Sequence, residues 1–431
     1  MKSNCLYTRR TFLAQMGALG VAPLVVPSSV FGAVSPNEKI QVGVIGTGGR
    51  GRSHIIDLFE NYRDTARVVA ICDVNANHLG KTKKMVDEMY QDTLCSTFSD
   101  FRELIARDDV DAVFITTPEH WHAIPALAAI RAGKHVFVEK PLAYTPVQGR
   151  TIVDAVKQFG VAFQYGTQQR YAGEYHRACM LARNGYLGAL RTVRVGSPFG
   201  LRGGSATPIS PPDGLDYDFW LGPAPYKPYT DGRCDGSGGT GWYHIRDYSG
   251  GWITGWGSHD MDIAHWGMDM DSSGPKEVSG TAEYDTSGVY DTAWRWRFEC
   301  IYPNDMKVVY ASEDENRHGV RFEGDDGWVF VSRGVLEAEP ESLLSLPFKD
   351  SDIHLDRSIR HLEDFFHAIR TGQRTTANVD AAHSSANACH ICNIAAELER
   401  TVTWDAAKER FVNDEEANRL LSRALRPPWR L

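Results

Sequence analysis

The sequence predicts an α/β protein that contains a parallel sheet near its N-terminus and a large, mostly antiparallel, open sheet after it. Short apolar runs rich in branched residues alternate with helical stretches up to about residue 165, as in parallel strand–helix–strand units. Beyond about residue 186, apolar and polar residues alternate instead, as in an antiparallel sheet with one polar face. The 431 residues suffice for two domains with substantial cores.

The first 33 residues are interpreted as an export signal. Arg9 and Arg10 stand just before a Phe-Leu pair, and the modest apolar run over 16–26 is too short to span a bilayer stably. Twin arginines of this kind are typical of the bacterial twin-arginine route, which carries folded proteins to the periplasm. We therefore expect a twin-arginine signal peptide over 1–33 and no membrane span after its removal, with a Sec signal or a disordered tail as the alternatives.

The charge of the chain bears on its partners. Without the three basic residues of the signal segment, the formal net charge of -9 becomes -12. A chain this acidic repels phosphate backbones, and its lysines and arginines form no basic stripe in the sequence. The composition therefore argues against a nucleic-acid partner.

Five short strands are predicted in the first part of the chain, over 42–45, 68–72, 112–116, 135–139 and 161–165. Helices separate them, one of which covers 123–132. Another begins at Pro146 with Thr145 as its N-cap, because proline is favoured at the first helical position and threonine just before it.

A glycine-rich turn follows the first strand and opens a helix. It fits the pattern G-x-G-x-x-G with Gly46, Thr47, Gly48, Gly49, Arg50 and Gly51. Gly46 permits the tight turn, Gly48 lets the backbone approach a pyrophosphate, and Gly51 lets helix and strand pack closely. Asp73 ends the second strand, where its carboxylate can bind the adenosine ribose and repel a 2′-phosphate. The pattern predicts a Rossmann domain over 38–165 that binds NAD rather than NADP.

A lysine follows the strand over 135–139. Lys140 comes directly after Glu139, at the sheet edge that faces the ligand crevice, so we expect it near the nicotinamide. Its amino group could exchange a proton with a substrate hydroxyl, with a pKa lowered by desolvation. A solvated lysine that braces Glu139 is the alternative. Arg170, after the strand over 161–165, could clamp substrate oxygens or form a structural ion pair.

The second domain is expected over 166–356. Apolar residues alternate with arginine and glutamate over 294–300, and the runs over 307–311 and 328–331 are similar. A sheet with one polar face favours a homodimer or homotetramer. The long irregular region over 197–257 is rich in glycine, proline and aromatic residues, and such loops are usually functional or disordered.

The last part of the chain, 357–431, is interpreted as helices that pack back on the two domains. Cys389 and Cys392 form a C-x-x-C pair in a helical stretch, but no second ligand pair accompanies them. His120 and His122 also lack an evident third ligand. We expect buried, reduced thiols and no metal site.

Four motifs stand out along the chain: G-T-G-G-R-G at 46–51, T-P-E-H-W-H-A at 117–123, A-G-K-H-V-F-V-E-K-P-L at 132–142 and D-Y-S-G-G-W-I-T-G-W-G-S-H-D-M-D-I-A-H-W at 247–266. Together they resemble the Gfo/Idh/MocA oxidoreductase family. The resemblance covers about residues 38–431 and is specific in combination. It implies a Rossmann domain, an α/β domain whose open sheet often mediates oligomerisation, and sugars, polyols or their derivatives as substrates.

The resemblance also implies site residues. Lys140 matches the family lysine that orients and protonates the reacting oxygen, and His259 matches its usual acid/base partner. Thr117, Pro118 and His122 match the loop that flanks the nicotinamide ribose, and Glu139 and Lys140 complete the expected cofactor contacts. Expected substrate contacts come from His122, Arg170, His244 and Asp262.

One position departs from the family pattern. Many dehydrogenases of the family carry an aspartate four residues before the histidine, whereas this chain has Gly255 there. His259 therefore works with Lys140 alone, or another group supplies the second proton. The candidates are Asp260, Asp262, His244 and Tyr243.

Export restricts the function, because the periplasm holds no pool of free NAD. The enzyme must carry its cofactor tightly bound and regenerate it in place, through a redox partner, through a second sugar as acceptor, or through a redox-neutral glycosidase cycle. That cycle resembles the NAD-dependent α-N-acetylgalactosaminidases, which tend to carry Glu-Val-Pro where this chain has Glu139-Lys140-Pro141.

The retained lysine favours an NAD-dependent oxidoreductase that acts on a CH–OH group of a sugar or glycoside. Oxidation at C3 of a glucoside, or reduction of its 3-keto form, is the most concrete hypothesis. A non-catalytic sugar-binding protein that retains NAD is the third interpretation.

Overall fold

The computed structural model describes residues 39–356 and 360–431. The signal peptide predicted for residues 1–33 lies outside the described residues. In the part of the chain that is described, no helix is long and apolar enough to cross a membrane.

The first domain is built on a six-stranded parallel sheet in the order β3-β2-β1-β4-β5-β6. Its strands are β1 (Ile40–Ile45), β2 (Ala66–Cys72), β3 (Ser96–Phe98), β4 (Ala112–Ile115), β5 (His135–Val138) and β6 (Phe163–Tyr165). The strand order reverses between β1 and β4, which places a ligand crevice at the carboxyl edge there, as in Rossmann domains. The predicted strands are confirmed. β3 was not predicted, because Ser96, Thr97 and Phe98 form no apolar run and none of the three is buried.

Helices pack on both faces of this sheet. They are α2 (Gly49–Tyr62), α3 (Ala76–Tyr90), α4 (Phe101–Ile105), α5 (Ala123–Arg131) and α6 (Pro146–Phe159). The predicted cap of α6 is confirmed, since the Thr145 hydroxyl accepts a hydrogen bond from the backbone N–H of Gln148 at 3.3 Å. Pro146 stands at the first helical position. These helices fix the carboxyl ends of the strands around the crevice.

The second domain is built on a nine-stranded sheet in the order β13-β12-β11-β7-β10-β9-β8-β14-β15. Among the described strand pairs of this second sheet, only β7 and β10 run parallel. The strands are β7 (Leu190–Ser197), β8 (Glu277–Tyr284), β9 (Ala293–Ile301), β10 (Lys307–Ser312), β11 (Gly319–Gly324), β12 (Trp328–Ser332), β13 (Val335–Glu339), β14 (Val402–Asp405) and β15 (Arg410–Phe411). The predicted large, mostly antiparallel sheet is confirmed.

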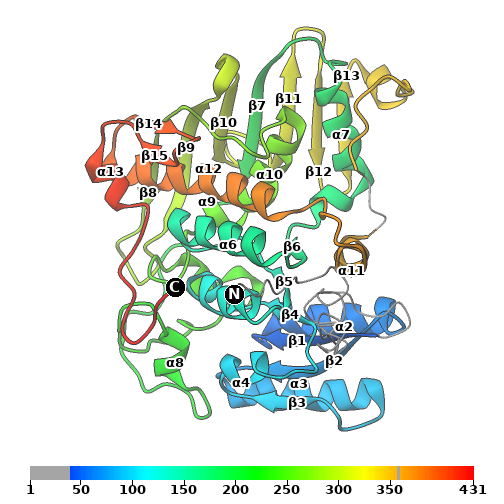
Figure 1. The fold of residues 1–431 in the computed structure, drawn as a ribbon. Helices are drawn as coiled ribbons and strands as arrows, with labels where there is room; N and C mark the ends of the chain where they lie inside the picture. The colour runs from blue at the N-terminus through cyan, green and yellow to red at the C-terminus, as the bar shows by residue number, and fades with distance from the viewer. Residues whose placement is uncertain (1–38, 357–359) are drawn as a thin grey trace, which may run out of the picture.

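The two faces of the second sheet differ. Figure 1 shows α7 (Gly173–Arg183), α10 (Gly257–Met268) and α12 (Val379–Leu398) against one face, toward the Rossmann domain. In β9, Trp296 and Phe298 are buried, whereas Arg297 is exposed and pairs with Glu315 at 2.7 Å on the opposite face. The alternation predicted for this strand is therefore observed.

The C-terminal segment departs in part from the prediction of helices alone. It contains α11 (His361–Thr371), α12 and α13 (Glu415–Arg419), but β14 and β15 extend the edge of the nine-stranded sheet between them. Val402 and Trp404 alternate with polar residues and are buried, which is the two-residue period of a strand. α11 packs on the Rossmann sheet, where the Phe365 ring lies 5.9 Å from that of Phe114.

The irregular region between the sheets docks on the carboxyl edge of the Rossmann sheet. It contains the short helices α8 (Tyr217–Leu221) and α9 (Trp252–Gly255), and its aromatic side chains form a core of their own. The backbone N–H of Asp216 donates to the carbonyl of Val74 at 3.0 Å, and the Trp121 indole donates to the carbonyl of Trp220 at 2.9 Å. These contacts make the region one wall of the crevice.

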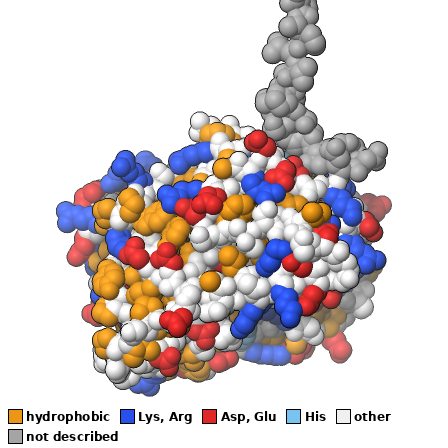
Figure 2. Space-filling model, turned by 90° about the horizontal axis from the view of Figure 1, so that it is seen from below, with side chains coloured by type: hydrophobic (Ala, Val, Ile, Leu, Met, Phe, Trp, Pro, Cys, Tyr) orange, Lys and Arg blue, Asp and Glu red, His pale blue; other side chains and the backbone are white. Residues whose placement is uncertain are grey.

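The seven cysteines of the described residues are reduced, and six are buried. Cys300 and Cys392 lie with their sulfur atoms 3.6 Å apart. No cluster of three His, Cys, Asp or Glu side chains within 39–356 and 360–431 could hold a metal ion. On the face drawn in Figure 2, acidic and basic side chains are interspersed rather than sorted into areas of one sign.

Candidate active site

The glycine-rich turn packs against the neighbouring strand. Gly46 has a φ of 90°, and a Cβ there would lie 2.8 Å from the carbonyl oxygen of Thr116. A Cβ at Gly51 would lie 2.0 Å from the carbonyl oxygen of Gly46. At Gly48 and Gly49, by contrast, an added Cβ would meet nothing within 4 Å, and both residues line a cavity. The N-terminus of α2 is thus open to a pyrophosphate, and the turn fits a dinucleotide.

Asp73 lies at the end of β2, at the wall of the same cavity. One carboxylate oxygen accepts hydrogen bonds from the backbone N–H and the hydroxyl of Thr47, at 2.7 and 2.9 Å. The other accepts from the backbone N–H of Asn75 at 2.8 Å. These donors fix the carboxylate, and its remaining lone pairs can accept from ribose hydroxyls.

The cavity has a volume of about 450 Å³ and occupies the Rossmann crevice. The irregular region supplies the wall opposite the glycine-rich turn, with Leu215, Phe219, Trp220, Trp242 and Tyr243. A ligand that binds the turn is therefore enclosed between the Rossmann domain and this aromatic wall.

The loop after β4 supplies part of the lining. Thr117 and Pro118 face the cavity, as expected. His122 is buried beside them, with Nδ1 2.7 Å from the carbonyl oxygen of Pro141 and Nε2 2.9 Å from that of Thr117. Burial lowers the pKa of His122. This corrects the predicted substrate and cofactor contacts of His122, because its ring ties the loop to the segment after Lys140.

Glu139 forms a buried cluster with two basic side chains of α2. Its Oε1 lies 2.5 Å from Nε of Arg50 and 2.7 Å from Nε2 of His54. Burial opposes ionisation of Glu139, but Arg50 and His54 outweigh burial and hold the pKa of Glu139 well below its usual range. Arg50 also lines the cavity, so this cluster ties the pyrophosphate turn to the end of β5.

Lys140 is held at the cavity wall by a backbone carbonyl. Its Nζ donates a hydrogen bond to the Gly255 oxygen at 2.9 Å and lies 5.7 and 5.8 Å from the ring centroids of Tyr243 and Trp252. Burial lowers the pKa of Lys140, against the opposing effect of nearby carboxylates. The amine is therefore placed and tuned for proton exchange at the crevice.

His259 stands on α10, four residues after the carbonyl that holds Lys140. Its Nδ1 lies 3.3 Å from the hydroxyl of Thr167. The side chain is only 4% exposed, and burial together with the charge of Lys140 holds the pKa of His259 well below its usual value. Lys140 therefore lines the cavity, whereas His259 is buried behind the lining, close enough for the charge of Lys140 to lower its pKa, and its imidazole is neutral.

Arg170 and Asp262 form a buried ion pair outside the cavity lining. Arg170 Nε and Nη2 lie 2.7 and 2.8 Å from the two carboxylate oxygens of Asp262, and Nη1 lies 2.7 Å from Asp271. The predicted substrate contacts of both residues are corrected, because their charges are used in joining α10 to the segment after β6. The structural ion pair is the role that the arrangement gives Arg170.

His244 is also engaged within the protein. Its Nδ1 accepts a hydrogen bond from the backbone N–H of Leu201 at 3.2 Å, and Nε2 donates to the carbonyl of Gly239 at 2.8 Å. Both nitrogens brace the irregular region, which corrects the predicted substrate contact. Of the other candidates for the second proton, Tyr243 lines the cavity and Asp260 is fully buried.

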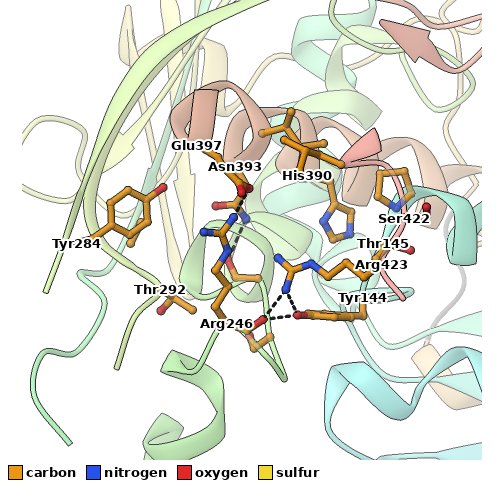
Figure 3. A pocket seen from close by; sticks show the side chains of 16 residues that line it. Tyr144, Thr145, Arg246, Tyr284, Thr292, His390, Asn393, Glu397, Ser422 and Arg423 are labelled. Atoms are coloured by element: carbon orange, nitrogen blue, oxygen red, sulfur yellow. Dashed lines mark hydrogen bonds and ion pairs between the residues drawn. The ribbon is translucent and has the colours of Figure 1, made fainter. Parts of the chain in front are cut away.

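Glu119 has no role in the sequence-based predictions, yet it lies fully buried at the start of the 3₁₀ turn η2 (Glu119–Trp121). It contacts the segment 249–254, which leads to Gly255. A second cavity of about 240 Å³ is lined by Ser249 and Gly250 of that segment, with Arg246 and Asn393 also in its wall (Figure 3). The available sequence signal was a carboxylate separated by three residues from the apolar run over 123–130.

Two family models match the chain. The model of an oxidoreductase family's NAD-binding Rossmann fold matches residues 40–167, and that of the same family's C-terminal alpha/beta domain matches residues 200–431. Both matches agree with the two sheets described above.

The chain is similar to curated proteins over a limited length. An alpha-N-acetylgalactosaminidase of Shewanella oneidensis is 33% identical over 170 residues, which are 38% of this chain and 36% of the relative. A glycosyl hydrolase family 109 protein of Shewanella sp. strain ANA-3 is 37% identical over 145 residues, 32% of this chain and 31% of the relative. The chain thus matches about a third of the length of these relatives.

Solved structures share the fold. An aldose-aldose oxidoreductase of Caulobacter crescentus, complexed with glycerol, has a TM-score of 0.62 at 20% identity and covers 85% of this chain and 100% of its own. The WlbA dehydrogenase of Bordetella pertussis, in complex with NADH and UDP-GlcNAcA, has a TM-score of 0.63 at 17% identity, with coverages of 85% and 99%. With the dinucleotide turn, the sheet order and both domain matches in agreement, the chain belongs to the Gfo/Idh/MocA oxidoreductase family.

Proposed function

We propose that this protein is an exported, NAD-dependent oxidoreductase that acts on a CH–OH group of a sugar or glycoside and keeps its cofactor tightly bound. The position of Lys140 carries the proposal. Its amine lies at the wall of the dinucleotide cavity, is held by the Gly255 carbonyl at 2.9 Å, and has a pKa lowered by burial. Such a group can accept a proton from a hydroxyl at the crevice.

The reaction balances with groups of this chain and one cofactor. Bound NAD⁺ supplies the hydride acceptor. The hydroxyl proton of the substrate passes to the neutral amine of Lys140. At the same time the substrate carbon that bears the hydroxyl loses its hydrogen as hydride, and a carbonyl results. In the reverse direction the ammonium returns the proton, and the neutral imidazole of His259 holds the reacting oxygen or a neighbouring hydroxyl.

Two features support the choice of NAD and its retention. The Asp73 carboxylate would repel a 2′-phosphate, which favours NAD over NADP. The aromatic wall over the glycine-rich turn, which includes Trp220 and Trp242, hinders release of a bound dinucleotide. Retention of the cofactor suits a protein that folds before export. The twin arginines predict the periplasm as its destination.

The most specific form of the proposal is oxidation at C3 of a glucoside, or reduction of the 3-keto form. A second sugar or a redox partner then takes up the electrons. A structural relative is named an aldose-aldose oxidoreductase, which supports a second sugar as the acceptor.

A redox-neutral glycosidase is the second candidate. It is favoured by the curated relatives, one of which is named an alpha-N-acetylgalactosaminidase. In that cycle Lys140 would serve the oxidation and the closing reduction, with elimination of the aglycone and addition of water between them.

One experiment separates these functions. The protein is purified without added nucleotide, and the near-ultraviolet absorbance of reduced NAD is followed while a panel of glycosides is titrated and the products are weighed by mass spectrometry. A rise in reduced NAD with a product lighter by two hydrogens supports the dehydrogenase. Cleaved glycoside without a net rise supports the glycosidase, and bound NAD that no sugar reduces supports a binding protein instead.

A further inference from the structure

Glu119 is a buried carboxylate that binds a single neighbouring segment. Its Oε1 accepts a hydrogen bond from the Ser249 hydroxyl at 2.8 Å, and its Oε2 accepts from the backbone N–H of Gly250 at 3.0 Å. The Thr254 hydroxyl is 3.5 Å from Oε2. The side chain is 0% exposed, so its oxygens depend on these donors rather than on water.

The segment that Glu119 holds ends at the carbonyl that holds Lys140. Residues 249–251 lead directly into α9, whose last residue, Gly255, accepts the hydrogen bond from Lys140 Nζ at 2.9 Å. From the opposite side, Asn393 of α12 donates to the Gly250 carbonyl at 2.9 Å (Figure 3). The segment is therefore fixed between Glu119 and α12.

The charge of Glu119 also acts on Lys140. Burial raises the pKa of Glu119 to about 7, while its hydrogen bonds and the charge of Lys140 favour its ionised form. In turn, Glu139 and Glu119 raise the pKa of Lys140 against burial. The other charged groups that act on Lys140 are Arg50 and Arg333, and the titratable neighbours of this site are His259, Tyr144 and Tyr243.

We propose, building on the oxidoreductase function above, that Glu119 is the positioning residue of Lys140. Through Ser249, Gly250 and Thr254 it fixes the carbonyl that orients the amine. Its negative charge stabilises the ammonium that forms when Lys140 accepts the substrate proton. Glu119 itself neither contacts the substrate nor takes up that proton.

The test compares three variants of the full-length protein. Glu119→Gln removes the charge at nearly constant shape, and Glu119→Asp keeps the charge. Asn393→Ala loosens the same segment from the α12 side without changing any charge. The glutamine amide oxygen can still accept from the backbone N–H of Gly250, and its NH₂ group can donate to the Ser249 hydroxyl, so the contacts to the segment can be kept.

Two measurements are made across pH. The first is kcat/KM for oxidation of the sugar found active, which rises as Lys140 loses its proton. The second is the acetylation rate of Lys140 by acetic anhydride, read by peptide mass spectrometry, which needs no substrate.

Glu119→Gln is expected to move the midpoint of both profiles to lower pH by about half a pH unit or more, as expected for loss of one nearby charge. Glu119→Asp and Asn393→Ala are expected to keep the original midpoint. An unchanged midpoint in Glu119→Gln, or the same displacement in Asn393→Ala, overturns the proposal. Should no sugar be oxidised by the unaltered protein, the proposed function fails, while the acetylation profile still decides the role of Glu119.

Discussion

Lys140 lies among charges that shift its pKa in opposite directions, the carboxylates upward and the arginines downward. Its proposed role in proton transfer gives an expectation for a variant that lacks the amine. Lys140→Ala should leave NAD bound, since the glycine-rich turn and Asp73 are untouched, but should slow hydride transfer by on the order of 10²–10⁴-fold. The measurement is single-turnover reduction of the bound cofactor by an active sugar.

Lys134→Ala is the matched control for that variant. Lys134 also has a pKa lowered by burial, but its amine donates to the carbonyl of Arg107, away from the cavity. Its turnover should stay within a small factor of the unaltered protein. Normal turnover of Lys140→Ala would show that Lys140 is not the catalytic residue.

Glu139 gives the fold a pH dependence. Its pKa in the folded state lies well below the ordinary 4.5, so the ionised group stabilises the fold above pH 4.5, and this contribution is lost as the pH falls toward the folded-state value. Glu139→Gln should lower the free energy of unfolding by about 1–3 kcal/mol at neutral pH and by less in acid. Denaturant titrations at several pH values measure the difference.

Glu416→Gln is the control, because Glu416 is exposed and pairs with Arg400 at the surface. Its effect should stay below about 1 kcal/mol. Equal destabilisation by Glu139→Gln at neutral and acidic pH would show that the carboxylate is not ionised in the fold.

The position of a side chain could be predicted from the sequence where the local pattern determines it. It could not be predicted where a partner far away in the sequence determines it. Lys140 and Asp73 each follow a strand of a parallel sheet, so their place at the crevice follows from the topology. Arg170 could equally have faced the substrate, because Asp271, which completes its ion pair, comes 101 residues later. The structural contacts of His244 could not be predicted either, because its partner Leu201 lies in an irregular segment.

At the scale of elements, α2 depends on one glycine. A Cβ at Gly51 would lie 2.0 Å from the Gly46 carbonyl oxygen, so Gly51→Ala must push α2 away from β1. We expect loss of bound NAD and a melting temperature lower by several degrees.

Gly80→Ala in α3 is the matched helical control, since its Cβ would meet nothing within 4 Å. It should retain NAD and gain up to about 1 kcal/mol from helix propensity. Nucleotide content after desalting and thermal melts distinguish the two. Full NAD content in Gly51→Ala would contradict the close packing of turn and helix.

The aromatic wall should govern how long the cofactor stays. Trp242 lines the cavity and is only 9% exposed, so Trp242→Ala opens this wall and should speed NAD release by on the order of tenfold. Trp294→Ala, on β9 and outside the cavity, is the control and should retain NAD normally. Release is followed by trapping free NAD with a second dehydrogenase, and equal rates in both variants would exclude the wall as a barrier.

Elements with a repeated pattern were predicted well, and the misses have local causes. β9 alternates over a full strand, so both its existence and its buried face could be read. β14 and β15 together span few residues after a long helix, and their strand character depends on pairing with β8. The irregular region offered composition but no period, so its docking on the Rossmann edge could not be foreseen.

At the scale of the whole molecule, the open sheet leaves a face of paired charges. Arg297 lies between Glu299 and Glu315, at 2.7 Å from each. If this face joins subunits into the proposed homodimer or homotetramer, Arg297→Glu places three acidic groups together and should release smaller species. Light scattering measures the mass, Arg419→Glu on α13 serves as the control, and an unchanged assembly in Arg297→Glu would place the interface elsewhere.

The way α11 and the segment near residue 429 return to the Rossmann domain has a consequence for synthesis. The Phe365 ring joins the core around Phe114, and the Trp429 ring lies 4.7 Å from Trp121 and 5.3 Å from Phe219. The domain made first therefore borrows its last packing partners from the part of the chain made latest. Until those residues have emerged from the ribosome, these ring contacts are missing, so we expect the Rossmann domain to bind its cofactor stably only after translation has passed residue 429.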